Sequence, residues 1–110
     1  MIRILVVDDH SVVRQGIKQI VADSPDIRIV GEAASGQEAL ELVRSRSFDL
    51  IILDISMPGQ SGLDILRELM AAAPALKVII LSMYPEEQYA IRSLRDGASA
   101  YLTKGARPKS

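Results

Sequence analysis

Five short aliphatic runs, alternating with four amphipathic segments, constrain the fold of this chain more than any other feature of its sequence. Leu50 to Leu53 are four consecutive aliphatic residues, which indicate a strand buried on both faces, as in a parallel sheet. The runs that we expect to be strands are Arg3–Val7, Ile27–Ala33, Leu50–Asp54, Lys77–Ser82 and Ala100–Thr103. Strict alternation of strands and helices predicts an α/β fold with a parallel sheet and right-handed crossovers.

Between these runs, apolar residues recur with the period of an α-helix. We expect Ser11 to be the N-cap of the first helix, and the capping-box sequence Ser35-Gly36-Gln37-Glu38 to open the second. The third helix is expected to start at Ser61. The fourth should run from Pro85 to Gly97, because proline suits a first helical turn and glycine a C-terminal stop.

Composition excludes several classes of protein. The 110 residues, 48% of them hydrophobic and 25% charged, are typical of a single globular domain. The net charge of −1 does not favour nucleic acid or an anionic membrane, and no apolar run approaches the ~20 residues that span a bilayer. The absence of cysteine excludes disulfides and thiol chemistry, and a lone His10 cannot build a zinc site. We expect a cytoplasmic location and no membrane partner.

Acidic side chains stand at the ends of two of the expected strands. Asp8 and Asp9 follow the first run, and Asp54 ends the third. Open α/β sheets bind ligands at the carboxyl ends of their strands, so these three carboxylates are expected to share one pocket. At ~4 Å and an effective dielectric constant of ~20, each pair repels by about 4 kcal/mol, and such a cluster either takes up protons or binds a cation. Oxygen ligands of this kind favour Mg²⁺.

A carboxylate beside Mg²⁺ is a competent nucleophile toward phosphorus and would form an aspartyl phosphate. The charge of the transferring phosphoryl group then needs donors, and Ser82 and Lys104 stand at the ends of the fourth and fifth strands. Taken singly, each residue has a plainer interpretation. Ser82 could begin a turn, Lys104 could be a solvated loop lysine, Tyr101 could pack at the sheet edge, and His10 could be a capping or loop residue.

Taken together, these motifs resemble the receiver domain of two-component response regulators over essentially the whole chain. They are Val6-Val7-Asp8-Asp9, Leu53-Asp54-Ile55-Ser56-Met57-Pro58-Gly59, Gly62, Leu81-Ser82 and Tyr101-Leu102-Thr103-Lys104. The resemblance implies a flavodoxin-like three-layer sandwich with sheet order 2-1-3-4-5, a final helix that is missing or truncated, and a receiver domain over residues 1–105. Residues 106–110 would be the start of a truncated fifth helix or a linker.

The resemblance also implies roles for individual residues. Asp54 would be the phosphoacceptor, receiving a phosphoryl group from a sensor histidine kinase. Mg²⁺ would be held by Asp9, by Asp8 partly through water, by Asp54 and by the backbone carbonyl of Ser56. Lys104 would contact the phosphoryl oxygens, and Ser82 would hydrogen-bond to the phosphoryl group while Tyr101 changes rotamer. Such a domain is not an enzyme, although it would catalyse its own phosphorylation and dephosphorylation.

Three further segments resemble one subfamily, the NarL/FixJ (LuxR-type) regulators, whose second domain is a helix-turn-helix DNA binder. They are Asp8-Asp9-His10, Val13-Arg14-Gln15-Gly16 and Asp96-Gly97-Ala98. By this resemblance, DNA would be contacted only through a C-terminal domain that is not in this chain, and the function would be regulation of transcription. Because the first and last helices of this fold share one face, a missing final helix should leave that face half covered. The expected exposed residues alternate within 6–7, 51–53 and 101–102, and self-association through them would give a homodimer.

Three other functions remain open at this stage. A metal-dependent phosphohydrolase with an aspartyl intermediate would usually carry an acid two residues after the nucleophile, where this chain has Ser56. A phosphorylation-independent interaction domain would normally have lost Asp54 or Lys104. A nucleotide- or flavin-binding module would need a glycine-rich loop after the first strand, which here carries two acids instead.

Overall fold

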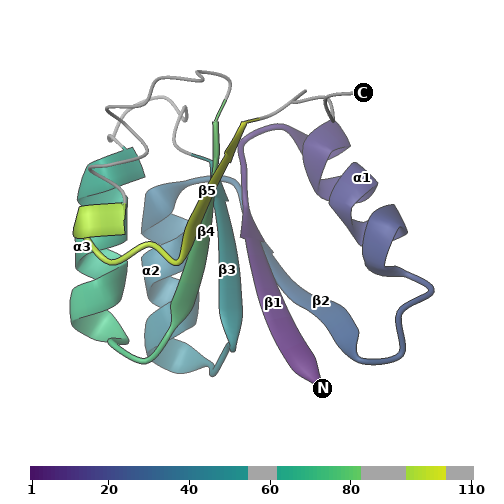
Figure 1. The fold of residues 1–110 in the computed structure, drawn as a ribbon, viewed down its shortest axis with the longest axis horizontal. Helices are drawn as coiled ribbons and strands as arrows, with labels where there is room; N and C mark the ends of the chain where they lie inside the picture. The colour runs from purple at the N-terminus through teal and green to yellow at the C-terminus, as the bar shows by residue number, and fades with distance from the viewer. Residues whose placement is uncertain (55–61, 83–93, 104–110) are drawn as a thin grey trace.

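Five parallel strands form one sheet in the order β2-β1-β3-β4-β5 in a computed structural model that describes residues 1–54, 62–82 and 94–103 (Figure 1). The strands are β1 Ile2–Val7, β2 Ile27–Ala33, β3 Leu50–Asp54, β4 Lys77–Ser82 and β5 Ala100–Thr103. The helices are α1 Ser11–Val21, α2 Gly36–Ser45 and α3 Gly62–Ala72. The flavodoxin-like fold and its strand order are therefore confirmed. The fourth predicted helix lies largely outside the described residues, as do the predicted start of the third and residues 106–110.

The N-cap of α2 lies where the sequence predicts it, whereas the N-cap of α1 lies one residue earlier than predicted. Ser35 caps α2, since its hydroxyl accepts a hydrogen bond from the backbone N–H of Glu38 at 3.2 Å. The carboxylate of Glu38 accepts the N–H of Ala34 at 3.1 Å, so the reciprocal bond of the capping box is displaced by one residue. The prediction for α1 was wrong by one residue, because His10 takes the N-cap position and Ser11 is already helical. The carbonyl of His10 accepts the first two helical hydrogen bonds.

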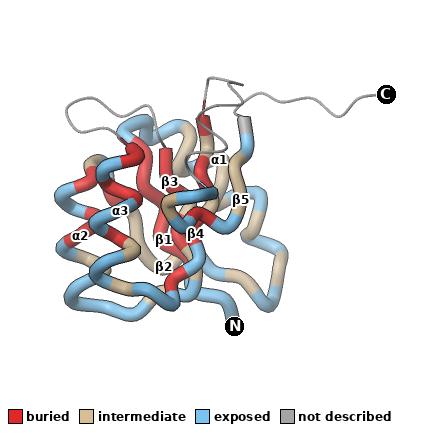
Figure 2. Tube along the Cα trace, turned by 60° about the vertical axis from the view of Figure 1, so that its left-hand side comes forward, coloured by how far each residue is buried: buried red, intermediate tan, exposed pale blue. Residues whose placement is uncertain are grey.

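The main hydrophobic core lies between the sheet and the pair α2 and α3, which cover one face side by side (Figure 1). Figure 2 shows buried residues concentrated in the central strands and on the inner sides of these helices. The largest fully buried aliphatic side chains in this core are Leu5, Ile51, Leu53, Ile65, Leu66, Leu69 and Ile80. Because side chains alternate along a strand, the intervening residues point to the opposite face.

The opposite face carries α1, and this helix covers it incompletely (Figure 1). None of the 11 residues of α1, all of which the structure describes, is buried. On the sheet beneath, Ile52 and Ile79 are only half-buried and Leu102 is 53% exposed. The predicted half-covered face is thus confirmed for β3 and β5 and wrong for Val6, which is 1% exposed. Among the described residues, no helix is long and apolar enough to cross a membrane.

Candidate functional site

The parallel register of β1 and β3 brings the predicted acids together. Val7 pairs with Leu53, so Asp8, which follows β1, lies beside Asp54, which ends β3. Carboxylate oxygens of Asp8, Asp9 and Asp54 and one ring nitrogen of His10 all lie within 4.8 Å of one another. The carboxyl end of the two central strands therefore forms an acidic pocket that could bind a metal ion.

The three carboxylates differ in exposure. Asp8 and Asp54 are each 1% exposed, whereas the side chain of Asp9 is 27% exposed. Ionised carboxylates are buried in proteins only when hydrogen bonds, opposite charges or a cation compensate their lost hydration. Two buried carboxylates and a third that is partly exposed, all presenting oxygen atoms, match the ligand preference of a small hard cation.

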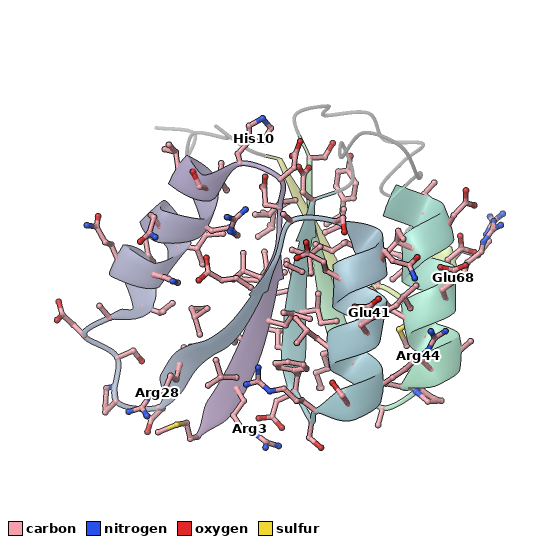
Figure 3. All side chains as sticks on the ribbon, turned by 180° about the vertical axis from the view of Figure 1, so that it is seen from behind. Arg3, His10, Arg28, Glu41, Arg44 and Glu68 are labelled. Carbon is pink, nitrogen blue, oxygen red and sulfur yellow. The ribbon has the colours of Figure 1, made fainter. Side chains whose placement is uncertain are left out.

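The interpretation of His10 as a capping residue is confirmed, and the same residue also belongs to this cluster. It occupies the N-cap position of α1, and its Nδ1 also lies 3.0 Å from Oδ1 of Asp8 and 3.1 Å from Oδ1 of Asp9. Its backbone N–H donates to the same oxygen of Asp8 at 2.8 Å. In Figure 3 it stands at the end of the molecule where β1 and β3 finish. Its position directly after two aspartates was the signal available in the sequence.

A second set of polar contacts lies behind the acidic pocket and was missed by the sequence analysis. Nη1 of Arg14 donates to the backbone carbonyl of Asp8, and its Nε lies 3.0 Å from Oε1 of Glu32 on β2. The ammonium of Lys18 pairs with the other carboxylate oxygen of Glu32. Hydrogen bonding from Lys18, reinforced by Arg14, holds the pKa of Glu32 below its ordinary value, so this carboxylate is ionised at neutral pH.

The remaining predicted residues are placed only in part. Ser82 ends β4, the neighbour of β3, and is fully buried at the same edge of the sheet as Asp54. Tyr101 lies on β5 opposite Ile80 of β4 and packs against the core. Ser56 and Lys104 lie outside the described residues. The structure thus brings four predicted residues to one sheet edge, Asp8, Asp9, Asp54 and Ser82, with Tyr101 two strands away from Asp54.

Comparisons with known proteins agree with this geometry. The sequence profile of the response regulator receiver domain matches residues 4–110. The chain is 42% identical over 106 residues to the response regulator GacA of Pseudomonas viridiflava, and 38% identical over 109 residues to the response regulator UvrY of Escherichia coli K12. These alignments cover 96% and 99% of this chain but 50% of each relative. The chain therefore spans about half the length of the curated relatives it matches.

Solved structures give the same result for the fold. A LuxR-family two-component response regulator from Aurantimonas superposes with a TM-score of 0.90 at 33% identity, over 96% of this chain and 76% of that one. The response regulator domain of Thermotoga maritima CheB superposes with a TM-score of 0.89 at 38% identity, over 100% of this chain and 83% of that one.

Proposed function

Since this chain belongs to the response regulator receiver domain family, we propose that its Asp54 accepts a phosphoryl group from a sensor histidine kinase. The chain is thus the receiver domain of a two-component response regulator. The observation that carries this proposal is the pocket of Asp8, Asp9, Asp54 and His10 at the end of the two central strands. Mg²⁺ is the proposed cofactor, because its preferred ligands are carboxylate and carbonyl oxygens and water.

In this proposal a carboxylate oxygen of Asp54 attacks the phosphorus of a phosphohistidine. The phosphorus–nitrogen bond breaks, the imidazole leaves with a proton, and an aspartyl phosphate remains. Asp8, Asp9, Asp54 and the carbonyl of Ser56 would hold Mg²⁺, which when bound supplies positive charge against the phosphoryl oxygens.

Ser82 and Lys104 are proposed to donate to the phosphoryl oxygens. This role is supported by the position of Ser82, which is buried at the end of the neighbouring strand, at the same edge of the sheet as Asp54. Tyr101 would then change rotamer, and the surface of residues 85–96 and β5 would change with it. A difference of about 1–3 kcal/mol in interaction with the phosphoryl group is enough to shift such an equilibrium usefully.

The output is proposed to lie in the remainder of a longer polypeptide. The relatives are about twice as long as this chain, and a DNA-binding domain of the NarL/FixJ type following the receiver would make the whole protein a regulator of transcription. In this proposal residues 1–105 are the receiver and residues 106–110 begin its last helix or a linker. The receiver itself would catalyse only its own phosphorylation and dephosphorylation, in the cytoplasm.

Phosphorylation by a small donor tests this proposal. After treatment with acetyl phosphate and Mg²⁺, mass spectrometry should find one acid-labile phosphate on the native chain and none on Asp54→Asn. Asp49→Asn is a matched control, because Asp49 pairs with Arg3 at the opposite end of the sheet. Stoichiometric phosphate on Asp54→Asn would refute the assignment. Continuous turnover of acetyl phosphate without a retained phosphate would favour a phosphohydrolase.

A further inference from the structure

Arg14 connects three separate parts of the fold beside the acidic pocket. It comes from the first turns of α1, donates through Nη1 to the backbone carbonyl of Asp8 at the end of β1, and pairs through Nε with Glu32 of β2. Its side chain is only 18% exposed. A guanidinium group is planar and rigid, so two hydrogen bonds in different directions fix both of its partners relative to each other.

The backbone carbonyl of Asp8, which accepts the hydrogen bond from Arg14, also influences where Asp9 lies. The carbonyl of Asp8 and the N–H of Asp9 belong to one planar peptide unit, so a hydrogen bond that fixes the carbonyl also fixes the start of Asp9. The other side of Asp8 is fixed as well, because its N–H donates to the carbonyl of Ala33 at 3.0 Å. Asp9 is also the most exposed of the three carboxylates, and burial alone restrains it least.

Glu32 is a firm anchor for this arrangement. Its strand pairs with β1, and the register shifts between Ile4 and Leu5, so that Val30 has no partner and Glu32 lies opposite Val6. Residues paired across a parallel ladder point to the same face, and this bulge therefore places Glu32 on the side of α1. Lys18 pairs with the second carboxylate oxygen and keeps Glu32 ionised and oriented.

We propose that Arg14 is a positioning residue for the cation site: by holding the Asp8 carbonyl against Glu32, it orients the peptide unit that presents the Asp9 carboxylate. This inference rests on the proposed role of Asp9 as a Mg²⁺ ligand. Groups that orient metal ligands typically change metal affinity 10- to 100-fold when they are removed. Arg14 touches no reacting atom in this arrangement, and its effect is on the geometry of the pocket before a cation binds as well as on binding.

The test is the substitution Arg14→Lys, which keeps the positive charge but loses the rigid two-way donor. Calorimetric titration should show Mg²⁺ affinity lowered on the order of tenfold. In the metal-free protein, the amide signals of Asp9 and His10 should shift. Arg3→Lys is the matched control, since it makes the same change in an ion pair at the opposite end of the sheet and should leave both readouts unchanged.

A second control separates positioning of Asp9 from attachment of α1. Lys18→Gln removes the other partner of Glu32 without touching the Asp8 carbonyl, so it should lower Mg²⁺ affinity clearly less than Arg14→Lys does. An equal loss of affinity in Lys18→Gln and Arg14→Lys would overturn the proposal, because helix attachment would then explain both. A folded Arg14→Lys variant with native affinity and native amide signals would also overturn it.

If Arg14→Lys does not fold, Glu32→Gln decides the question. This variant weakens the anchor, because a neutral acceptor binds a guanidinium less strongly than a carboxylate. Its Mg²⁺ affinity should fall, by less than the roughly tenfold loss expected on removal of the orienting group itself, and an unchanged affinity would refute the proposal. If the native chain itself binds no Mg²⁺, the proposed function fails. The metal-free amide signals of Asp9 in Arg14→Lys or Glu32→Gln still decide whether Arg14 positions that residue.

Discussion

The two faces of the sheet are covered by helices in different ways. On one face, α2 and α3 bury aliphatic side chains completely, and Ile65 packs so closely that Gly36 of α2 has no room for a side chain. On the other face, α1 buries none of its residues, and Val12 and Ile20 are 80% and 81% exposed. The described contacts of α1 include ion pairs from Arg14 and Lys18 to Glu32, and three of its apolar residues, Val13, Ile17 and Val21, are half-buried.

This difference indicates that one face of the sheet mainly stabilises the domain and the other mainly fixes the geometry near the acidic pocket. Burial of apolar surface supplies most of the free energy of folding, so the face of α2 and α3 should set the stability of the chain. Ion pairs near the surface contribute little to stability but fix geometry. The ion pairs of α1 lie beside the acidic pocket, because Arg14 also donates to the backbone carbonyl of Asp8.

The largest expected contrast comes from truncating one aliphatic residue on each side. Leu69→Ala on α3 should lower the free energy of unfolding by about 2–5 kcal/mol, because Leu69 is fully buried and its removal leaves a cavity. Ile20→Ala on α1 should change it by less than about 0.5 kcal/mol, because Ile20 is exposed. Urea unfolding of both variants measures the contrast, and similar losses at the two positions would contradict it.

Replacing each of two helical glycines by alanine should change the stability of the chain in opposite directions. A Cβ on Gly36 would lie 2.5 Å from Cγ1 of Ile65, and Gly36→Ala should therefore destabilise the chain by about 1–3 kcal/mol. A Cβ on Gly16 of α1 would meet nothing within 4 Å, and Gly16→Ala should stabilise it by about 0.5–1 kcal/mol through higher helix propensity. Thermal melts should show a lower melting temperature for Gly36→Ala and a higher one for Gly16→Ala than for the native chain. Destabilisation by Gly16→Ala would mean that α1 is packed more closely than the structure indicates.

The smallest expected effect is the pH dependence of the attachment of α1. The pKa of Glu32 is lowered by Lys18 and Arg14 in the folded chain, so its contribution to stability is fully present above its ordinary pKa of 4.5. That contribution is lost as the pH falls below 4.5 through the lower folded-state pKa, and it should amount to less than about 1 kcal/mol. Urea unfolding between pH 3 and 6 should show this loss of stability in the native chain and not in Glu32→Gln. Glu41→Gln, which makes the same chemical change at an exposed position of α2, is the control and should retain the loss of stability that Glu32 causes.

Much of the fold was predictable because its signals are local. The aliphatic runs of the strands, the capping residues of α2 and the acids that follow β1 and end β3 are all readable within a few residues. Parallel strands end at one edge, so gathering Asp8, Asp9 and Asp54 needed no tertiary information beyond the strand order. The cap of α1 was misplaced because His10 is held by the carboxylate of Asp8, a contact that capping preferences do not include.

The sequence by itself determined which residues form strands, because periodicity decides that, and with the strand order that the family resemblance implies it also determined which carboxylates meet at their ends. Only the tertiary structure decided which residues surround that pocket. Strict alternation along β2 would put Ile29 and Glu32 on opposite faces, yet the bulge at Val30 turns both toward α1. Arg14 meets Glu32 for that reason, 18 residues further along the chain. A contact of this kind depends on how two strands pair, and no local pattern encodes it.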